Sequence, residues 1–149
     1  TVVLTQIVGE FSERAEKNQL EMVVECPQPP VEIYVDGRHL WRIIDNLMGN
    51  ICKYAQPGTR VYITLEKFHG MVIMTFRNIS KDRLKMTSEE LFGRFVRGDS
   101  SRNTEGHGLG LSIAKSLTEL MHGNLAVQMD GDLFKVILSF EEYQEDKKQ

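Results

Sequence analysis

The sequence has few of the residues that build cross-linked or metal-stabilised scaffolds. Its 149 residues include only two cysteines, Cys26 and Cys52, which are too few and too far apart for a disulfide framework or a zinc site. We therefore expect two reduced thiols in a cytoplasmic setting. The four histidines also lack a spacing that would gather them on one helix face as metal ligands.

Long apolar runs and a large excess of one charge are also missing. No apolar run approaches the roughly 20 residues that span a bilayer, and the first residues, TVVLTQIVGEF, have no basic segment followed by a long apolar core. The net charge is −3, with Lys and Arg scattered along the chain, which argues against a protein that binds nucleic acid by neutralising phosphates. We expect neither nucleic acid nor direct membrane contact for this chain.

Apolar residues are abundant enough for one core. They make up 41% of the chain, which predicts a single domain over residues 1–149. Helical periodicity predicts helices over 4–20, 36–55 and 109–121, and runs rich in β-formers predict strands at 20–26, 31–35, 60–68, 71–78, 124–129 and 133–140. This order predicts an α+β fold with a mixed sheet that is covered by helices on one face and open on the other.

Local signals predict where several of these elements start and stop. Asp36 is a plausible N-cap for the second helix, and the dipeptide His69-Gly70 is placed to turn a hairpin. Gly123 is placed to end the third helix as its C′ residue. The charged tail, residues 141–149, is expected to fray.

The third helix follows a loop with three glycines, Gly106, Gly108 and Gly110, within five positions. Unpaired N–H groups and the positive end of the helix dipole converge at such a loop, so it forms an anion site. A flexible connector is the alternative interpretation. Residues 80–108 before the helix carry no strong pattern, and so long a segment is usually functional or mobile.

The second helix carries a polar stripe. Asn46, Asn50 and Lys53 fall at i, i+4 and i+7, on a face separate from the apolar residues of the same helix. Asparagine is a poor residue for a helix interior because its amide competes with the backbone. Two of them one turn apart suggest a binding role, and an ordinary solvated face is the alternative. The apolar residues of this helix are Leu40, Ile43, Ile44, Leu47, Met48 and Ile51.

Three segments together resemble one family. The stretch DNLMGNICKYA resembles the N box, GHGLGLSIAKSL the G2 box and LFGRFVRGDSSR the F box of the ATP-binding (HATPase) domain of bacterial sensor histidine kinases, in the GHKL superfamily. The motifs stand in the family's order, and the resemblance covers essentially the whole chain. It implies a Bergerat-type two-layer sandwich with about three helices on one face of the sheet and an ATP lid over residues 81–107.

The resemblance also implies roles for the polar stripe. Asn46 and Asn50 would hold Mg²⁺ and the phosphates that it bridges, because amide oxygens are hard neutral ligands. Lys53 would contact phosphate, and Tyr54 would lie beside the nucleoside or its phosphates. Together with Arg97 of the lid, Asn46, Asn50 and Lys53 form the implied catalytic group.

Further roles fall on the lid and the glycine loop. Arg97 and Arg102 are candidates to reach the γ-phosphate, with a solvated basic loop as the alternative. Phe92 and Phe95 would anchor the lid, with plain core packing as the alternative. The glycines would let the lid close over the triphosphate, whose oxygens meet the start of the third helix. The implied phosphate-binding residues there are Gly106, Gly108, Leu109 and Gly110.

One motif departs from the family's pattern. The family's G1 box, Asp-x-Gly-x-Gly, corresponds here to RNISKDR, which places Asn78 at the carboxylate and Ser80 and Asp82 at the glycines. An amide oxygen can still accept a hydrogen bond from the adenine amino group. It lacks the charge assistance of a carboxylate, which is about 1 kcal/mol or more, so we expect weaker ATP binding.

The reaction implied is phosphotransfer. ATP hydrolases of the superfamily carry a glutamate base four residues before the essential asparagine, where this chain has Asn46, and Asp45 lies about 100° around the helix. The resemblance therefore implies transfer of the γ-phosphoryl group of Mg·ATP to a histidine on a separate dimerisation domain of the same protein. A response-regulator receiver domain would be a further partner, and the whole would be the cytoplasmic part of a membrane-anchored receptor. Two alternatives stay open, namely a degenerate GHKL domain acting as an interaction module and an anti-sigma-type serine kinase.

Overall fold

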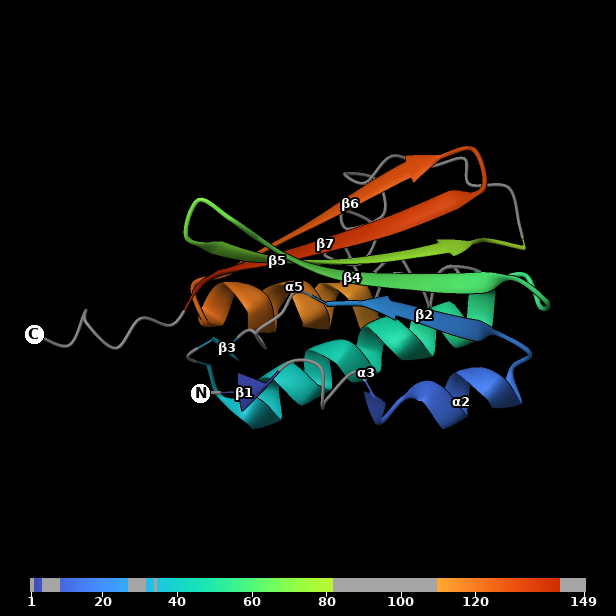
Figure 1. Ribbon diagram of the computed structural model, residues 1–149, viewed down its shortest axis with the longest axis horizontal. Coiled ribbons are helices and arrows are strands. Elements are labelled where there is room, and N and C mark those ends of the chain that lie inside the picture. Colours follow the sequence, from blue (N-terminus) through green and yellow to red (C-terminus); the bar gives the residue numbers. More distant parts are fainter. Residues whose placement is uncertain (1, 4–8, 27–31, 34, 82–109, 143–149) are drawn as a thin grey trace, which may run out of the picture.

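The computed structural model describes residues 2–3, 9–26, 32–33, 35–81 and 110–142 (Figure 1). Three helices and seven strands lie in this part of the chain. In chain order they are β1 (Val2–Val3), α2 (Ser12–Lys17), β2 (Glu21–Glu25), β3 (Glu32–Ile33), α3 (Gly37–Tyr54), β4 (Arg60–Phe68), β5 (Met71–Ile79), α5 (Gly110–Leu120), β6 (Asn124–Asp130) and β7 (Leu133–Glu141).

The main sheet has five strands in the order β2-β4-β5-β7-β6. The pair β2–β4 is parallel and the other pairs are antiparallel, so the sheet is mixed. Figure 1 shows all three helices on the same side of this sheet. The predicted α+β architecture, with helices over one face, is confirmed.

Several predicted boundaries change in the structure. The helix expected over 4–20 ends earlier, at Lys17 of α2, because Gln19 adopts a left-handed φ of 60° and the Leu20 N–H bonds back to the Ala15 carbonyl at 3.0 Å. Residues 4–8 lie outside the described residues. Within the strand expected at 31–35, the structure describes β3, which pairs with β1 outside the main sheet. Residues 31 and 34 lie outside the described residues, and Asp36 caps α3.

The first residues of the tail that was expected to fray, residues 141–149, are ordered. Strand β7 runs to Glu141, and Glu142 pairs with Ile33 and forms an ion pair with Lys67 at 2.9 Å. Fraying from residue 141 is therefore wrong at its first two positions. Residues 143–149 lie outside the described residues.

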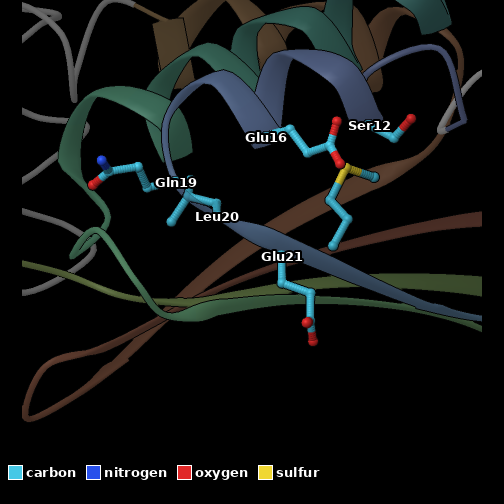
Figure 2. A pocket seen from close by; sticks show the side chains of 6 residues that line it. Ser12, Glu16, Gln19, Leu20 and Glu21 are labelled. Carbon is cyan, nitrogen blue, oxygen red and sulfur yellow. The ribbon is translucent and has the colours of Figure 1, made fainter.

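A groove of about 490 Å³ opens between α2 and the start of β2 (Figure 2). None of the residues singled out from the sequence as site residues lines it, so we assign it no part in the predicted site. Its lining residues are Ser12, Glu16, Gln19, Leu20, Glu21 and Met22.

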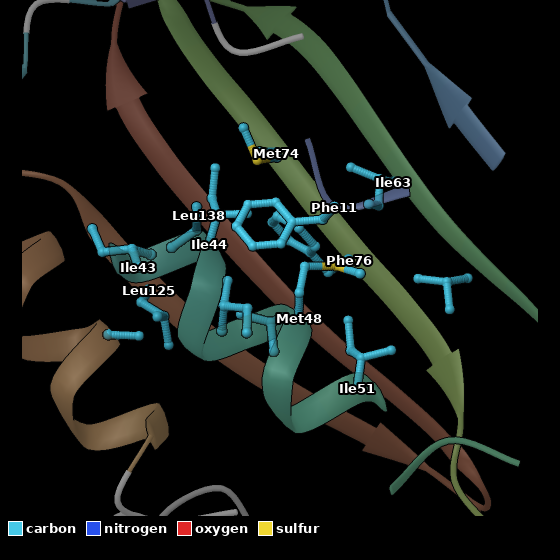
Figure 3. Close-up of a cluster of buried hydrophobic side chains, with 14 of the residues drawn as sticks. Phe11, Ile43, Ile44, Met48, Ile51, Ile63, Met74, Phe76, Leu125 and Leu138 are labelled. Carbon is cyan, nitrogen blue, oxygen red and sulfur yellow. The ribbon is translucent and has the colours of Figure 1, made fainter. Parts of the chain in front are cut away.

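The core lies between α3 and the covered face of the sheet (Figure 3). The six apolar residues predicted on the second helix are all at most 3% exposed, and Val61, Ile63 and Leu65 of β4 are buried as their alternation predicts. Full burial of one such side chain stabilises the fold by about 1.5–3 kcal/mol relative to exposure. This packing holds α3 against the sheet and thereby places its polar stripe.

The start of α3 is capped as predicted. The Asp36 side chain accepts a hydrogen bond from the Arg38 backbone N–H at 2.8 Å. That hydrogen bond lowers the pKa of Asp36, since it favours the charged carboxylate. The predicted hairpin turn is also confirmed, because His69 and Gly70 both have positive φ angles, 50° and 77°, as a type I′ turn requires.

The end of α5 differs from its prediction. The residue in the left-handed conformation is His122, with φ 63°, and Gly123 follows it. The Gly123 N–H bonds to the Thr118 carbonyl at 2.9 Å and the His122 N–H to the Glu119 carbonyl at 3.0 Å, which is the Schellman pattern with His122 at C′. Glycine is needed at 123 for another reason, because a Cβ there would lie 2.5 Å from Phe140 Cε1.

Both cysteines are free in the structure, with Cys26 exposed and Cys52 half-buried. Burial raises the pKa of each thiol. Within the described part of the chain, no helix is long and apolar enough to cross a membrane.

Candidate functional site

The polar stripe of α3 is built as the sequence predicts, and its members differ in exposure. Asn50 is only 6% exposed and Asn46 is half-buried, whereas Lys53 at the end of the stripe is exposed. The Lys53 ammonium lies 5.6 Å from the centre of the Tyr54 ring. The stripe therefore leads from a buried amide to a solvent-accessible cation.

Two amide atoms of this stripe are buried without a hydrogen-bond partner among the described residues. They are Nδ2 of Asn46 and Oδ1 of Asn50. Leaving such an atom unpaired costs about 1–3 kcal/mol, which is why buried polar atoms in native proteins are almost always bonded. A bare amide oxygen suits a hard cation and a bare amide N–H suits an anion, so these residues fit a magnesium ion and a phosphate group.

The start of α5 lies directly beside Asn46. A Cβ placed on Gly110, the first residue of α5, would lie 3.8 Å from the Asn46 carbonyl oxygen and 4.0 Å from its Cβ. The fold thus brings the start of the helix after the glycine loop to the asparagine stripe. The unpaired N–H groups and positive dipole of a helix N-terminus favour an anion at that place.

The other end of α3 is joined to the end of β5. The Gln56 N–H bonds to the Ile79 carbonyl at 2.7 Å, and the Lys81 N–H bonds to the Tyr54 carbonyl at 2.9 Å. Asn78 is 4% exposed and stands two residues after buried Phe76 on β5, so both lie on the helix-covered face. The structure therefore places Asn78 under the helix layer, near the end of the strand that is bonded to α3.

Ser80, which stands where the family has a glycine, is buried and pairs with Ala55. Its N–H donates to the Asp132 carbonyl at 2.8 Å. The chain leaves β5 along an ordinary antiparallel path, which a serine adopts without strain. Asp82, at the second glycine position, lies outside the described residues.

Asp45 is directed away from the polar stripe, as its position on the helix predicts. Its Oδ1 accepts a hydrogen bond from Arg14 Nη1 at 2.6 Å, so the carboxylate is held between α2 and α3. A carboxylate engaged in this ion pair is not placed to take a proton from water beside Asn46.

The remaining predicted site residues lie outside the described residues, as does the predicted lid except for Lys81. Their roles stay predictions. They are Phe92, Phe95, Arg97, Arg102, Gly106, Gly108 and Leu109.

Two residues near the candidate site were not predicted from the sequence. Ser112, in the first turn of α5, has a buried Oγ with no hydrogen-bond partner among the described residues. Gly49 lies inside α3 between the two asparagines, and a Cβ there would lie 3.1 Å from Arg14 Nη2 of α2. A glycine inside a helix is unfavourable by about 1 kcal/mol. Its presence at position 49 was therefore a signal in the sequence that this position has a structural role.

Comparison with known proteins decides the family. Residues 35–144 match the HATPase_c model, described as histidine kinase-, DNA gyrase B- and HSP90-like ATPase. The chain belongs to this family. The matched region begins just before α3 and ends just after β7, so it contains α3, β5 and α5, the elements that carry the candidate site.

Similar proteins narrow the type of HATPase_c domain. The chain is 31% identical over 141 residues to the sensor histidine kinase RppB of Synechocystis, covering 91% of this chain and 31% of RppB. It is 39% identical over 107 residues to the probable sensor protein PcoS of Escherichia coli, covering 69% and 23%. The chain thus spans less than a third of the length of these relatives.

Solved structures show the same fold. The mycobacterial sensor histidine kinase MprB matches with a TM-score of 0.76 at 22% identity, covering 95% of both chains. Full-length ShkA, solved in complex with AMPPNP, matches with a TM-score of 0.74 at 23% identity, covering 95% of this chain and 30% of ShkA. The chain is thus a HATPase_c domain whose relatives and structural neighbours named above include sensor histidine kinases.

Proposed function

We propose that this domain binds Mg·ATP and transfers the γ-phosphoryl group to a histidine on a separate dimerisation domain of the same protein. The observation that carries this proposal is a pair of buried amide atoms, on Asn46 and Asn50, that have no hydrogen-bond partner among the described residues. Asn46 also lies beside the first residue of α5. A response-regulator receiver domain would then take the phosphoryl group from the histidine. The domain would work in the cytoplasm, where ATP is available, as part of a membrane-anchored receptor.

The residues of α3 have separable roles in this proposal. Asn50 and Asn46 hold the magnesium ion and the phosphates next to it through their amide groups. Magnesium supplies charge neutralisation and orientation of the triphosphate. Lys53 adds a point charge from the exposed end of the stripe, and Tyr54 lies beside it.

Phosphate binding is shared with α5 and the lid. Gly110 opens α5 next to Asn46, where the helix N-terminus favours an anion. The family resemblance supports a contribution from Gly106, Gly108 and Leu109 of the loop. It also supports Arg97 and Arg102 of the lid, residues 81–107, as contacts to the γ-phosphate.

Adenine recognition is assigned to Asn78. This amide is nearly fully buried on β5, on the face that packs under the helices. Its oxygen would accept a hydrogen bond from the adenine amino group. The bond is weaker than that of a carboxylate because it has no charge assistance.

Transfer rather than hydrolysis follows from the residues around Asn50. The position of a water-activating base is occupied by Asn46, whose amide cannot accept a proton at neutral pH. The neighbouring carboxylate, Asp45, is held by Arg14 at 2.6 Å on another face of α3. Catalysis then consists of positioning and charge neutralisation.

A second candidate function is a degenerate HATPase_c domain that binds other proteins and has lost productive ATP binding. Asn78 and Ser80 favour it, since they replace the acidic and first glycine positions of the G1 box. The two candidates differ in their affinity for nucleotide.

Titration of the 149-residue chain with ATP, with and without Mg²⁺, by calorimetry tests the proposal. We expect saturable binding that tightens when Mg²⁺ is added. The absence of binding under both conditions would contradict the kinase proposal and favour the interaction module. A positive result leads to a second assay, in which radiolabelled phosphate is transferred to a separately supplied histidine-bearing domain.

A further inference from the structure

The side chain of Arg14 connects α2 to α3, on a face of α3 other than the one that carries Asn46 and Asn50. Its Nη1 donates to Asp45 Oδ1 at 2.6 Å, and its guanidinium carbon lies 5.9 Å from the centre of the Phe11 ring. Phe11 is itself 4% exposed and belongs to the core. The carbonyl of Arg14 accepts a hydrogen bond from the Cys52 thiol of α3 at 3.9 Å, so both ends of this residue contact the same helix.

Gly49 leaves the space in which the guanidinium lies. A Cβ on Gly49 would stand 3.1 Å from Arg14 Nη2, closer than nearly all Cβ contacts in proteins. The guanidinium is at the same time held by Asp45. A side chain at position 49 would therefore require the Arg14 guanidinium to shift by a few tenths of an ångström.

The two α3 positions that face the Arg14 guanidinium immediately precede the two asparagines of the candidate site. Asp45 precedes Asn46, and Gly49 precedes Asn50, so on each turn the contact with α2 lies about 100° around the helix from the amide. Asn46 in turn lies beside Gly110 of α5. The rotation of α3 between these two contacts decides where the amides point.

Small rotations of α3 would matter for binding. A side-chain atom about 6 Å from the helix axis moves by about 1 Å when the helix turns by about 10°. A displacement of about 1 Å is enough to weaken positioned interactions severely. A contact that fixes the rotation of α3 therefore acts on the site without touching a ligand.

We propose that Arg14 is a positioning residue, which through Asp45 and the gap at Gly49 fixes the rotation of α3 and so aims the amides of Asn46 and Asn50. The inference rests on the proposed function of those two asparagines. The alternative is that Arg14 merely joins two helices. Its ion pair is partly exposed, at 43% for the Arg14 side chain and 34% for Asp45, and such a pair contributes little to stability.

Arg14→Met tests this proposal, because it keeps an unbranched side chain and removes the guanidinium. We expect Mg·ATP to bind about tenfold more weakly, equivalent to about 1.4 kcal/mol. Arg14→Lys, which retains a charge for Asp45, should recover part of the loss. Lys17→Met is the matched control, since Lys17 is on the same helix and, among the described residues, forms an ion pair only with Glu13, at 3.9 Å. It should leave the Kd unchanged.

A second measurement separates positioning from simple stabilisation. The side-chain amide resonances of Asn46 and Asn50 in the nucleotide-free chain should shift in Arg14→Met and not in Lys17→Met. If Arg14→Met lowers the melting temperature yet leaves both these resonances and the Kd for Mg·ATP unchanged, the positioning role is refuted.

The two proposals fail in different ways. If the unmodified chain binds no Mg·ATP, the proposed function is refuted, and the amide resonances still judge the role of Arg14. If the unmodified chain binds and Arg14→Met binds equally well, only the positioning role is refuted. Should Arg14→Met not fold, Arg14→Lys with the same two readouts decides the question.

Discussion

Buried asparagines in α3 lower the stability of the domain that carries them. Asparagine is a weaker helix former than alanine, by about 0.6 kcal/mol, and Asn50 also buries an oxygen without a hydrogen-bond partner among the described residues. The arrangement is what a ligand site requires, since a ligand makes the missing hydrogen bonds or coordination when it binds.

We therefore expect Asn50→Ala to separate binding from folding. Mg-dependent ATP binding should be lost, because the amide oxygen that suits the cation is gone. The melting temperature should stay close to that of the unmodified chain, since the penalty of a buried unpaired amide offsets the lost volume. Calorimetry and thermal unfolding measure the two effects.

Asn124→Ala is the control for this experiment, because Asn124 is an exposed residue at the start of β6. It should change neither quantity. Unaltered Mg·ATP affinity in Asn50→Ala, in a folded protein, would remove Asn50 from the site.

Asn78 decides between a working kinase and a degenerate one. Asn78→Asp should tighten ATP binding by up to about tenfold, or about 1.4 kcal/mol, because a carboxylate gives a charge-assisted acceptor for the adenine amino group. GTP should gain nothing, since its carbonyl at the same ring position repels a carboxylate. Parallel titrations with ATP and GTP in one buffer measure this difference.

The burial of Asn78 adds a second expectation for the same variant. The side chain is 4% exposed, so a carboxylate there lowers the stability of the free domain through desolvation. ATP should raise the melting temperature of Asn78→Asp more than that of the unmodified chain. Equal affinities for both nucleotides before and after the substitution would show that Asn78 only ends a strand.

At the scale of a helix, two neighbouring residues at the end of α5 have different structural roles. His122 carries the left-handed φ of 63°, and Gly123 provides a close approach to β7. His122→Gly should stabilise the domain by about 1 kcal/mol, because glycine has no Cβ to oppose this conformation. Gly123→Ala should destabilise it by about 1–3 kcal/mol, since the new Cβ meets Phe140 and the Ser139 carbonyl.

Urea unfolding measures both changes in the free energy of unfolding. His122→Ala serves as the control for the first, because alanine keeps the Cβ and should bring little gain. If Gly123→Ala were instead neutral and His122→Gly destabilising, the Schellman assignment with His122 at C′ would be incorrect.

The cap of α3 predicts a dependence on pH. The hydrogen bond from the Arg38 N–H lowers the pKa of Asp36 in the folded state. A lowered folded pKa means that the stabilisation is present above about pH 4 and is lost as the pH falls through the folded value. Asp36→Asn caps the helix equally well without a charge, so its melting temperature should fall less between pH 5 and pH 2 than that of the unmodified chain. Parallel slopes for the two proteins would show that this cap does not titrate.

Across the domain, the order of the strands predicts a gradient of local stability. Strand β5 is paired on both sides, with β4 and β7, and lies under α3, whereas β2 is an edge strand of the described sheet. In hydrogen exchange we expect the slowest amides in β5 and α3 and faster exchange in β2. Exchange at one uniform rate through the sheet would contradict this gradient.

The same hydrogen-exchange experiment tests the predicted lid. Residues 81–107, which lie outside the described residues apart from Lys81, should be the least protected segment in the free chain and should gain protection when ATP binds. Equal protection with and without nucleotide would argue against a lid there.

Local features of this protein could be predicted from the sequence because their causes are local. The helical period of α3, its cap at Asp36 and the turn at His69-Gly70 each depend on neighbouring residues, and all three are confirmed. The polar stripe of Asn46 and Asn50 follows from the same period. Three motifs in the right order were then sufficient to identify the family.

Most features that were not predicted from the sequence depend on contacts between distant segments. The parallel pairing of β2 with β4 and the close contact of Gly123 with Phe140 arise only when the layers pack. Arg14 and Gly49 were missed for the same reason, since a charged residue on one helix and a glycine on another carry no sign of their contact. Periodicity assigns a residue to a face of its own helix, and only packing decides what that face meets.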